Sequence, residues 1–148
     1  MGYTTDQYGF SKALSSDPDI RNKTALILGN GGAAKAIKYA LDGLGYRYTT
    51  VSRNTTKDTI TYRQITKQVI ENHTLIVNTT PLGVAPDILQ SPEIPYNYIT
   101  SKHFLFDLIY NPKQTTFLKH GLAKGATIAN GSMMLEFQAQ KAWNIWNS

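Results

Sequence analysis

Residues 26–36 read LILGNGGAAKA, in which an apolar run is followed by three glycines within four residues and then by alanines. The run at 24–29 is short and apolar, as expected of a buried parallel strand. The segment 33–45 has the spacing of an amphipathic helix. Glycines between a strand and a helix predict a tight turn that exposes the free N–H groups of the first helical turn. The helix is expected to bury one stripe, formed by Ala33, Ala36, Ile37, Ala40 and Leu41.

This turn matches the dinucleotide-binding pattern G-x-G-x-x-G/A at Gly29, Gly31 and Ala34. The N-terminus of a helix carries a partial positive charge, so a pyrophosphate is its natural ligand. The alternative is a turn with a structural role only. The strand–turn–helix context favours dinucleotide binding, and the residues expected to contact the cofactor are Gly29, Asn30, Gly31, Gly32 and Ala33.

The end of the next expected strand, residues 46–51, indicates which dinucleotide is bound. NAD-specific sites usually place an Asp or Glu here to hold the ribose 2′-hydroxyl. This chain instead has Ser52, Arg53 and Asn54. A guanidinium with neighbouring hydroxyls suits a 2′-phosphate, which favours NADP over NAD. The alternative is that Arg53 is an ordinary solvated loop residue.

Composition excludes several other classes of protein. The 148 residues are 41% hydrophobic and 17% charged, as in an ordinary globular domain. No apolar run approaches the roughly 20 residues that span a bilayer, so no membrane association is expected. The net charge of +5 comes from scattered lysines and arginines, which disfavours nucleic-acid binding. The chain has no cysteine, which fits a reducing, cytoplasmic location, and its three histidines lack metal-ligand spacing, so no metal is expected.

The rest of the chain continues the alternation of strand and helix. Residues 74–78, 103–110 and 126–130 are expected to form strands. Helices are expected at 62–71, with Tyr62, Ile65 and Val69 inward, and at 113–125, with Phe117, Leu118 and Leu122 inward. A closing helix is expected after Ser132 as its cap. Repeated strand–helix units predict one α/β domain over 1–148, a Rossmann-type doubly wound, mainly parallel sheet with helices on both faces.

Five stretches together resemble one family, the NADP-dependent shikimate dehydrogenases. GYTTDQYGF resembles the family's G-x-N-T-D-x-x-G segment, GNGGA its glycine loop, and SRN its asparagine-arginine-threonine cofactor clamp. DLIYNPKQTTFL and MMLEFQAQKAWNIW are similar to two further stretches of the family. The matches keep their order and cover the chain nearly end to end. Among the departures from the family pattern, Thr4 and Ser52 stand where the family has asparagine.

The resemblance implies a further domain that is expected to be absent from this chain. In the family, an N-terminal substrate domain supplies the catalytic lysine and most of the substrate-binding groups. Segments 1–15 and 131–148 are then expected to form helices at the hinge and the substrate side. Apolar surface that the missing domain would cover is expected to favour a homodimer.

The resemblance also assigns roles to single residues. Asp6 aligns with a catalytic, substrate-binding aspartate, although TTD before an apolar stretch also suits a helix N-cap. Tyr110 and Gln138 align with substrate contacts, although a core tyrosine and an exposed glutamine are the alternatives. The remaining cofactor contacts are expected at the nicotinamide end, from Thr79, Leu108, Gly131 and Met134.

The resemblance therefore implies an NADP(H)-binding domain of an enzyme that reversibly reduces 3-dehydroshikimate to shikimate. The fragment alone is expected to bind the cofactor without catalysing the reaction. Three alternatives remain: a quinate-type paralogue that uses NAD, a non-catalytic nucleotide-binding module, and an RNA-binding basic domain.

Overall fold

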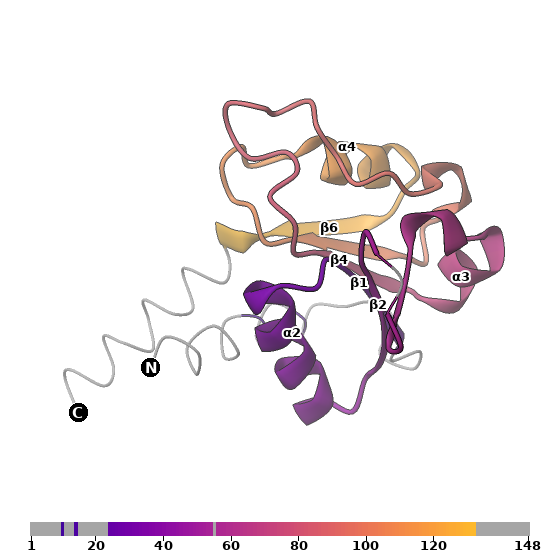
Figure 1. Ribbon diagram of the computed structural model, residues 1–148. Helices are drawn as coiled ribbons and strands as arrows, with labels where there is room; N and C mark the ends of the chain where they lie inside the picture. Colours follow the sequence, from indigo (N-terminus) through magenta and orange to yellow (C-terminus); the bar gives the residue numbers. More distant parts are fainter. Residues whose placement is uncertain (1–9, 11–13, 15–23, 55, 133–148) are drawn as a thin grey trace, which may run out of the picture.

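Six strands form one sheet at the centre of the molecule (Figure 1). The computed structural model describes Phe10, Leu14 and residues 24–54 and 56–132. All neighbouring strands are parallel, in the order β3-β2-β1-β4-β5-β6. This order is that of a doubly wound dinucleotide-binding sheet, so the expected fold class is confirmed. The strands are β1 (Thr24–Leu28), β2 (Arg47–Val51), β3 (Thr59–Ile60), β4 (Leu75–Asn78), β5 (Phe104–Asp107) and β6 (Thr127–Asn130).

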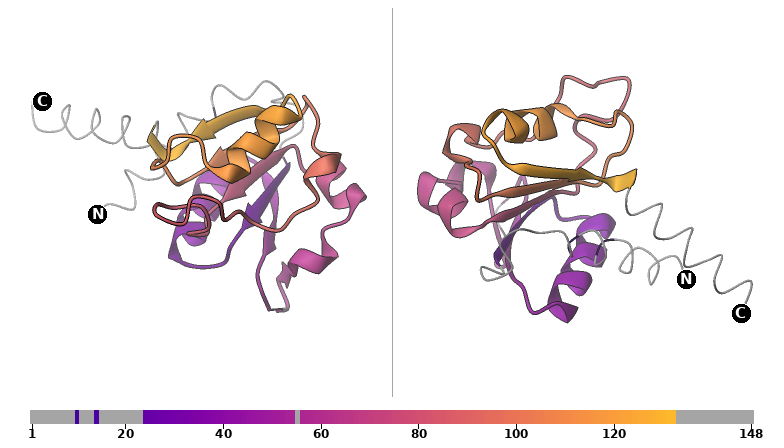
Figure 2. Two further views of the ribbon diagram at one scale, coloured as in Figure 1. Left: turned by 90° about the horizontal axis from the view of Figure 1, so that it is seen from above. Right: turned by 180° about the vertical axis from the view of Figure 1, so that it is seen from behind.

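Helices cover both faces of the sheet (Figure 2). Helix α2 (Gly32–Gly43) lies on one face, and α3 (Lys67–Asn72) and α4 (Thr116–Ala123) lie on the other. Two short 3-10 helices, η1 (Tyr62–Gln64) and η2 (Tyr96–Tyr98), belong to the second layer. Within the residues described, none of these helices is long and apolar enough to cross a membrane.

Successive side chains along each strand point to opposite faces of the sheet, which divides the core into two clusters. In β1, Ala25 and Ile27 face the α2 layer, whereas Leu26 and Leu28 face the α3 and α4 layer. All four side chains are fully buried, as expected of a strand covered on both sides. Phe10 joins the first cluster and meets Phe106 edge to face, with ring centroids 5.1 Å apart.

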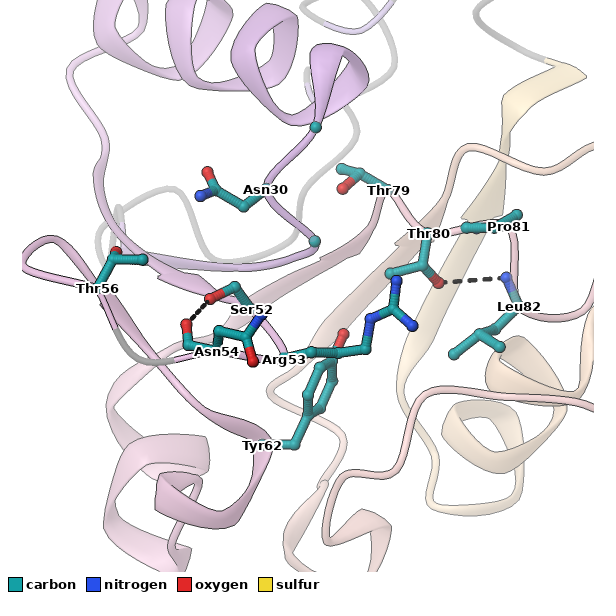
Figure 3. A pocket seen from close by; sticks show the side chains of 12 residues that line it. Asn30, Ser52, Arg53, Asn54, Thr56, Tyr62, Thr79, Thr80, Pro81 and Leu82 are labelled. Carbon is teal, nitrogen blue, oxygen red and sulfur yellow. Dashed lines mark hydrogen bonds between the residues drawn. The ribbon is translucent and has the colours of Figure 1, made fainter.

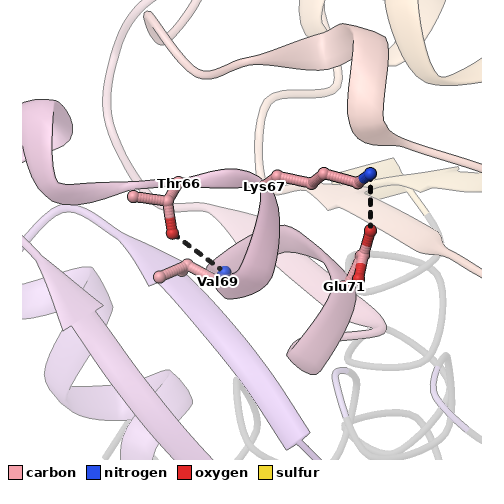
Figure 4. Close-up of polar contacts among 4 residues, drawn as sticks. All are labelled: Thr66, Lys67, Val69 and Glu71. Carbon is pink, nitrogen blue, oxygen red and sulfur yellow. Dashed lines mark hydrogen bonds and ion pairs between the residues drawn. The ribbon is translucent and has the colours of Figure 1, made fainter.

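The single helix expected at 62–71 is wrong, because the segment divides into η1 and α3. Ile65 between them is extended, at φ −80° and ψ 97°, and buries its side chain. The Thr66 hydroxyl starts α3 by accepting a hydrogen bond from the Val69 amide at 3.4 Å (Figure 4). Lys67 and Glu71 form an exposed ion pair at 3.8 Å, which adds little stability.

Two inward positions expected from helical spacing are also wrong. Ala33 is exposed, because α2 begins at Gly32 and its buried face is formed by Ala34, Ile37, Ala40 and Leu41. Leu122 is 49% exposed. Gly121 takes the inner position on α4, where a Cβ would approach Leu105 to 2.5 Å.

Two boundaries also differ from expectation. The strand expected at 103–110 ends at Asp107, where its pairing with β6 ends. Gly131 and Ser132 are already helical, and the Ser132 amide donates to Asn130 Oδ1 at 2.9 Å. Asn130, rather than Ser132, therefore occupies the cap position. The closing helix expected beyond it lies outside the described residues.

Candidate functional site

A cavity of about 610 Å³ opens at the carboxyl ends of β1, β2 and β4 (Figure 3). Strand β1 pairs with β2 on one side and with β4 on the other, so the strand order reverses at this point. Open α/β sheets bind their ligands at such a switch point. The lining residues are Gly29, Asn30, Gly31, Ser52, Arg53, Asn54, Thr56, Tyr62, Thr79, Thr80, Pro81 and Leu82.

Gly29 is required by the fold itself. Its φ of +110° disfavours a side chain, and a Cβ there would stand 2.5 Å from the Thr79 hydroxyl oxygen. The Gly29 amide donates to the carbonyl of Val51 at 2.8 Å, and the Thr79 amide donates to that of Leu28 at 2.9 Å. Gly29 therefore lets the ends of β1, β2 and β4 approach one another closely.

Gly31 differs, because nothing in the described fold requires a glycine there. Its φ of −101° is open to any residue, and a Cβ would meet no atom within 4 Å. A Cβ at Gly32 would also meet nothing. No side chain caps the start of α2, and its first turn holds no acidic residue. The turn thus leaves open space in front of free helical N–H groups, which suits an anion.

The loop after β2 is held by hydroxyl groups. The Ser52 hydroxyl donates to the Asn54 carbonyl and contacts the Thr59 hydroxyl at 3.0 Å. The Thr59 hydroxyl also contacts that of Thr56 at 2.7 Å. Since the hydrogen of Ser52 is directed into the loop, Ser52 shapes the loop in this arrangement rather than offering a donor to the cavity. Arg53 is exposed, and no described residue forms an ion pair or hydrogen bond with its guanidinium.

A buried polar network supports the turn after β4. The Asn78 side-chain amide donates to Asp107 at 3.1 Å. Its side-chain oxygen, Asn78 Oδ1, accepts from the Thr80 amide at 3.0 Å and from the Thr80 hydroxyl at 2.6 Å. Thr115 donates to the second Asp107 oxygen at 2.7 Å. Burial raises the pKa of Asp107, and these donors, together with the Ile109 amide, oppose the rise. The network is structural and fixes the wall formed by Thr80, Pro81 and Leu82.

The described residues that are expected to bind the cofactor fall into three groups. Those from the glycine turn, the β2 loop and Thr79 share the cavity, whereas Gly32 and Ala33 lie beside it at the start of α2. Leu108 and Gly131 lie against each other beyond β5 and β6, where a Cβ on Gly131 would meet the Leu108 carbonyl oxygen at 2.0 Å, and neither lines the cavity. Met134 lies outside the described residues.

The residues expected to bind substrate are not brought together in the described part of the chain. Tyr110 is 53% exposed and does not line the cavity. Asp6 and Gln138 lie outside the described residues. Their roles remain predictions.

Beyond the cofactor contacts expected above, the cavity lining holds Thr56, Tyr62, Thr80, Pro81 and Leu82. Tyr62 belongs to η1, directly after β3, and Leu82 belongs to the turn after β4. A signal for Tyr62 existed in principle, because any residue that follows a parallel strand lies at the ligand-binding edge. It was missed because Thr59–Ile60 is too short to be recognised as a strand without its partner β2.

Comparison with known proteins finds relatives of this chain. No model of a protein family matches the chain. An NADP+-dependent shikimate dehydrogenase from Desulforamulus reducens is 36% identical over 168 aligned residues, which cover 99% of this chain and 57% of the relative. The chain matches the C-terminal region of NADP+-dependent shikimate dehydrogenases. It thus spans somewhat more than half the length of the curated shikimate dehydrogenases that it matches.

Solved shikimate dehydrogenases share the fold. A chorismate mutase/shikimate 5-dehydrogenase fusion protein from Clostridium acetobutylicum superposes with a TM-score of 0.79 at 35% identity, covering 97% of this chain and 54% of that one. A shikimate dehydrogenase from Thermus thermophilus, solved with NADP(H) and shikimate, gives 0.78 at 28% identity, covering 96% and 56%. The resemblance expected from five separate stretches is therefore confirmed.

Proposed function

We propose that this chain binds NADP(H) in the cavity at the switch point, with the pyrophosphate at Gly31 and the 2′-phosphate at Arg53. The open space beside Gly31 carries the proposal, because neither its backbone conformation nor packing against described residues requires a glycine there. Arg53 lines the same cavity, and no described carboxylate pairs with it. The relatives named NADP+-dependent support this choice of cofactor.

The proposed activity of the whole protein is the reversible reduction of 3-dehydroshikimate to shikimate. The cofactor would supply the hydride, and the described residues would bind and orient it. Asp6, Tyr110 and Gln138 are proposed to contact the substrate. The 148-residue chain by itself is expected to bind NADP(H) with little turnover, since the resemblance assigns the catalytic lysine to a domain outside the matched region. A cytoplasmic location and a homodimer remain predictions.

Calorimetric titration with NADP+ and NAD+ tests the proposal. The chain should bind NADP+ more tightly than NAD+, and Arg53→Ala should remove most of the difference, because a charge-assisted hydrogen bond contributes about 1.5–3 kcal/mol. Arg63→Ala is the matched control, since Arg63 is also an exposed arginine but lies outside the cavity lining. Equal affinity for both cofactors in the unmodified chain would favour the NAD-using quinate paralogue. Binding of neither cofactor would contradict the proposal.

A further inference from the structure

Arg53 stands at the junction of two cavities. A second cavity of about 410 Å³ adjoins the first and is lined by Arg53, Tyr62, Leu82, Gln90, Ser91 and Glu93. The two linings share three side chains, those of Arg53, Tyr62 and Leu82. The smaller cavity also holds the carboxylate of Glu93, so the Arg53 cation borders one cavity with an acidic residue and one without.

Tyr62 is the fixed member of this shared wall. It begins η1, which is closed by a capping box in which the Thr61 amide donates to the Gln64 side chain at 2.8 Å. The ring packs against the core cluster on the α3 and α4 face. The Tyr62 side chain lines both cavities beside Arg53.

Both the arrangement of the side chains and the pKa of the phenol indicate that Arg53 and Tyr62 lie close together. The guanidinium of Arg53 is drawn beside the phenol of Tyr62, on the side toward Thr80 (Figure 3). Burial raises the pKa of the Tyr62 phenol, and the Arg53 cation lowers it in opposition. A guanidinium only donates hydrogen bonds, and a neutral phenol oxygen can accept one and leave the remaining N–H groups free.

We propose that Tyr62 is a positioning residue that holds the Arg53 guanidinium over the larger cavity and thereby strengthens the preference for NADP over NAD. The proposal rests on the proposed function, because it assumes that Arg53 binds the 2′-phosphate. Tyr62 acts through Arg53, so its effect is confined to the cofactor that carries this phosphate.

The affinities of Tyr62 variants for NADP+ and NAD+ provide the test. Tyr62→Leu removes both the ring and the hydroxyl, and is expected to weaken NADP+ binding by about five- to tenfold, while NAD+ binding stays within about twofold. Tyr62→Phe keeps the ring and is expected to lose about two- to threefold for NADP+ alone. In an Arg53→Ala background neither substitution should change NADP+ affinity further.

Controls separate positioning from general damage. Tyr98→Leu is the matched variant, because Tyr98 packs against the same core cluster and lines neither cavity. It should leave the ratio of the two affinities unchanged. If Tyr62→Leu fails to fold, as judged by circular dichroism, Tyr62→Phe alone decides.

Three results would overturn the inference: an equal loss for both cofactors, which indicates contact with a shared part of the dinucleotide; an effect that persists without Arg53; or an unchanged ratio in a folded variant. Failure of the proposed function is distinguishable, since the unmodified chain would then not bind NADP+, or Arg53→Ala would leave the ratio unchanged.

Discussion

Gly29 and Gly31 stand two residues apart and serve different purposes. Gly29 allows a backbone conformation and a close approach to Thr79, whereas Gly31 faces empty space. The glycine pattern in the sequence predicts the turn but does not tell these roles apart. The distinction depends on which strands end beside the turn.

Replacing these glycines by alanine should therefore affect different properties, stability for Gly29 and cofactor affinity for Gly31. Gly29→Ala is expected to cost about 1–3 kcal/mol of stability through backbone strain. Gly31→Ala should leave the free energy of unfolding within about 0.5 kcal/mol, as for a substitution without strain or lost contacts. It should still weaken NADP+ binding at least about tenfold, because a displaced phosphate loses charge-assisted hydrogen bonds. Urea denaturation and calorimetry measure the two quantities. Unchanged cofactor affinity in Gly31→Ala would contradict the placement of the pyrophosphate.

Thr115, the N-terminal cap of helix α4, has two functions. The buried Thr115 hydroxyl accepts from the Leu118 amide at 3.3 Å and donates to Asp107 at 2.7 Å. At α3, the exposed Thr66 makes only the first kind of bond. The two caps therefore look alike in the sequence and differ in their consequences.

Thr115→Ala should cost about 2–4 kcal/mol, because it removes a cap and leaves a buried carboxylate with one donor fewer. Thr66→Ala should cost about 0.5–1 kcal/mol through the cap alone. Thr115→Ser keeps the hydroxyl and serves as the control. Midpoints of chemical denaturation compare the three variants, and equal losses for Thr66→Ala and Thr115→Ala would show that the bond to Asp107 adds nothing.

His73 follows α3 as its C-terminal cap and has a buried side chain. One ring nitrogen lies 2.6 Å from the Val69 carbonyl and the other 2.9 Å from the Thr49 hydroxyl. A carbonyl only accepts, so the first nitrogen carries a proton, and in the neutral ring the second nitrogen accepts from Thr49. Burial lowers the pKa of His73 below its usual value, against the opposing effect of the Val69 carbonyl.

A lowered folded-state pKa makes stability depend on pH in one direction. The contribution of His73 is complete above the unfolded pKa of about 6.5 and is lost as the pH falls through the lower folded value. Unfolding free energies at pH 7.5, 6.5 and 5.5 should therefore decline more steeply for the unmodified chain than for His73→Gln. His120→Gln, at an exposed position, should keep the original slope. Parallel slopes for all three proteins would contradict the lowered pKa.

Regular elements with local signals were predictable from the sequence. The apolar strands, the glycine turn and α2 depend on their own residues, and the structure confirms them. Strand β3 has two residues and forms by pairing with β2, so the local spacing of Tyr62, Ile65 and Val69 predicts a helix instead. The second cavity and the position of Tyr62 beside it depend on the pairing of β3 with β2, so they could not be predicted from the sequence either.

At the scale of the whole molecule, the two faces of the sheet are covered differently. One face is covered by α3 and α4. The other receives α2 together with Phe10 and Leu14, which come from before β1 and are almost completely buried.

Truncating Phe10 should therefore weaken the entire fold rather than one end of it. Phe10→Ala is expected to cost about 3–5 kcal/mol through the cavity it leaves. Leu89→Ala is the surface control, since Leu89 is 85% exposed, and it should cost less than about 0.5 kcal/mol. Urea denaturation followed by fluorescence compares the two. A loss for Phe10→Ala as small as that of the control would show that Phe10 adds little to the core.

The packing of Phe10 on Phe106 also sets an order of events during synthesis. Phe10 is made before its partner ring in β5, which follows only after β1 to β4 and the helices between them. Until then the apolar side of α2 lacks part of its cover, and the newly made chain presents that surface to chaperones. The burial of Phe10 on this face therefore waits for translation of β5, however quickly the earlier strands and helices form.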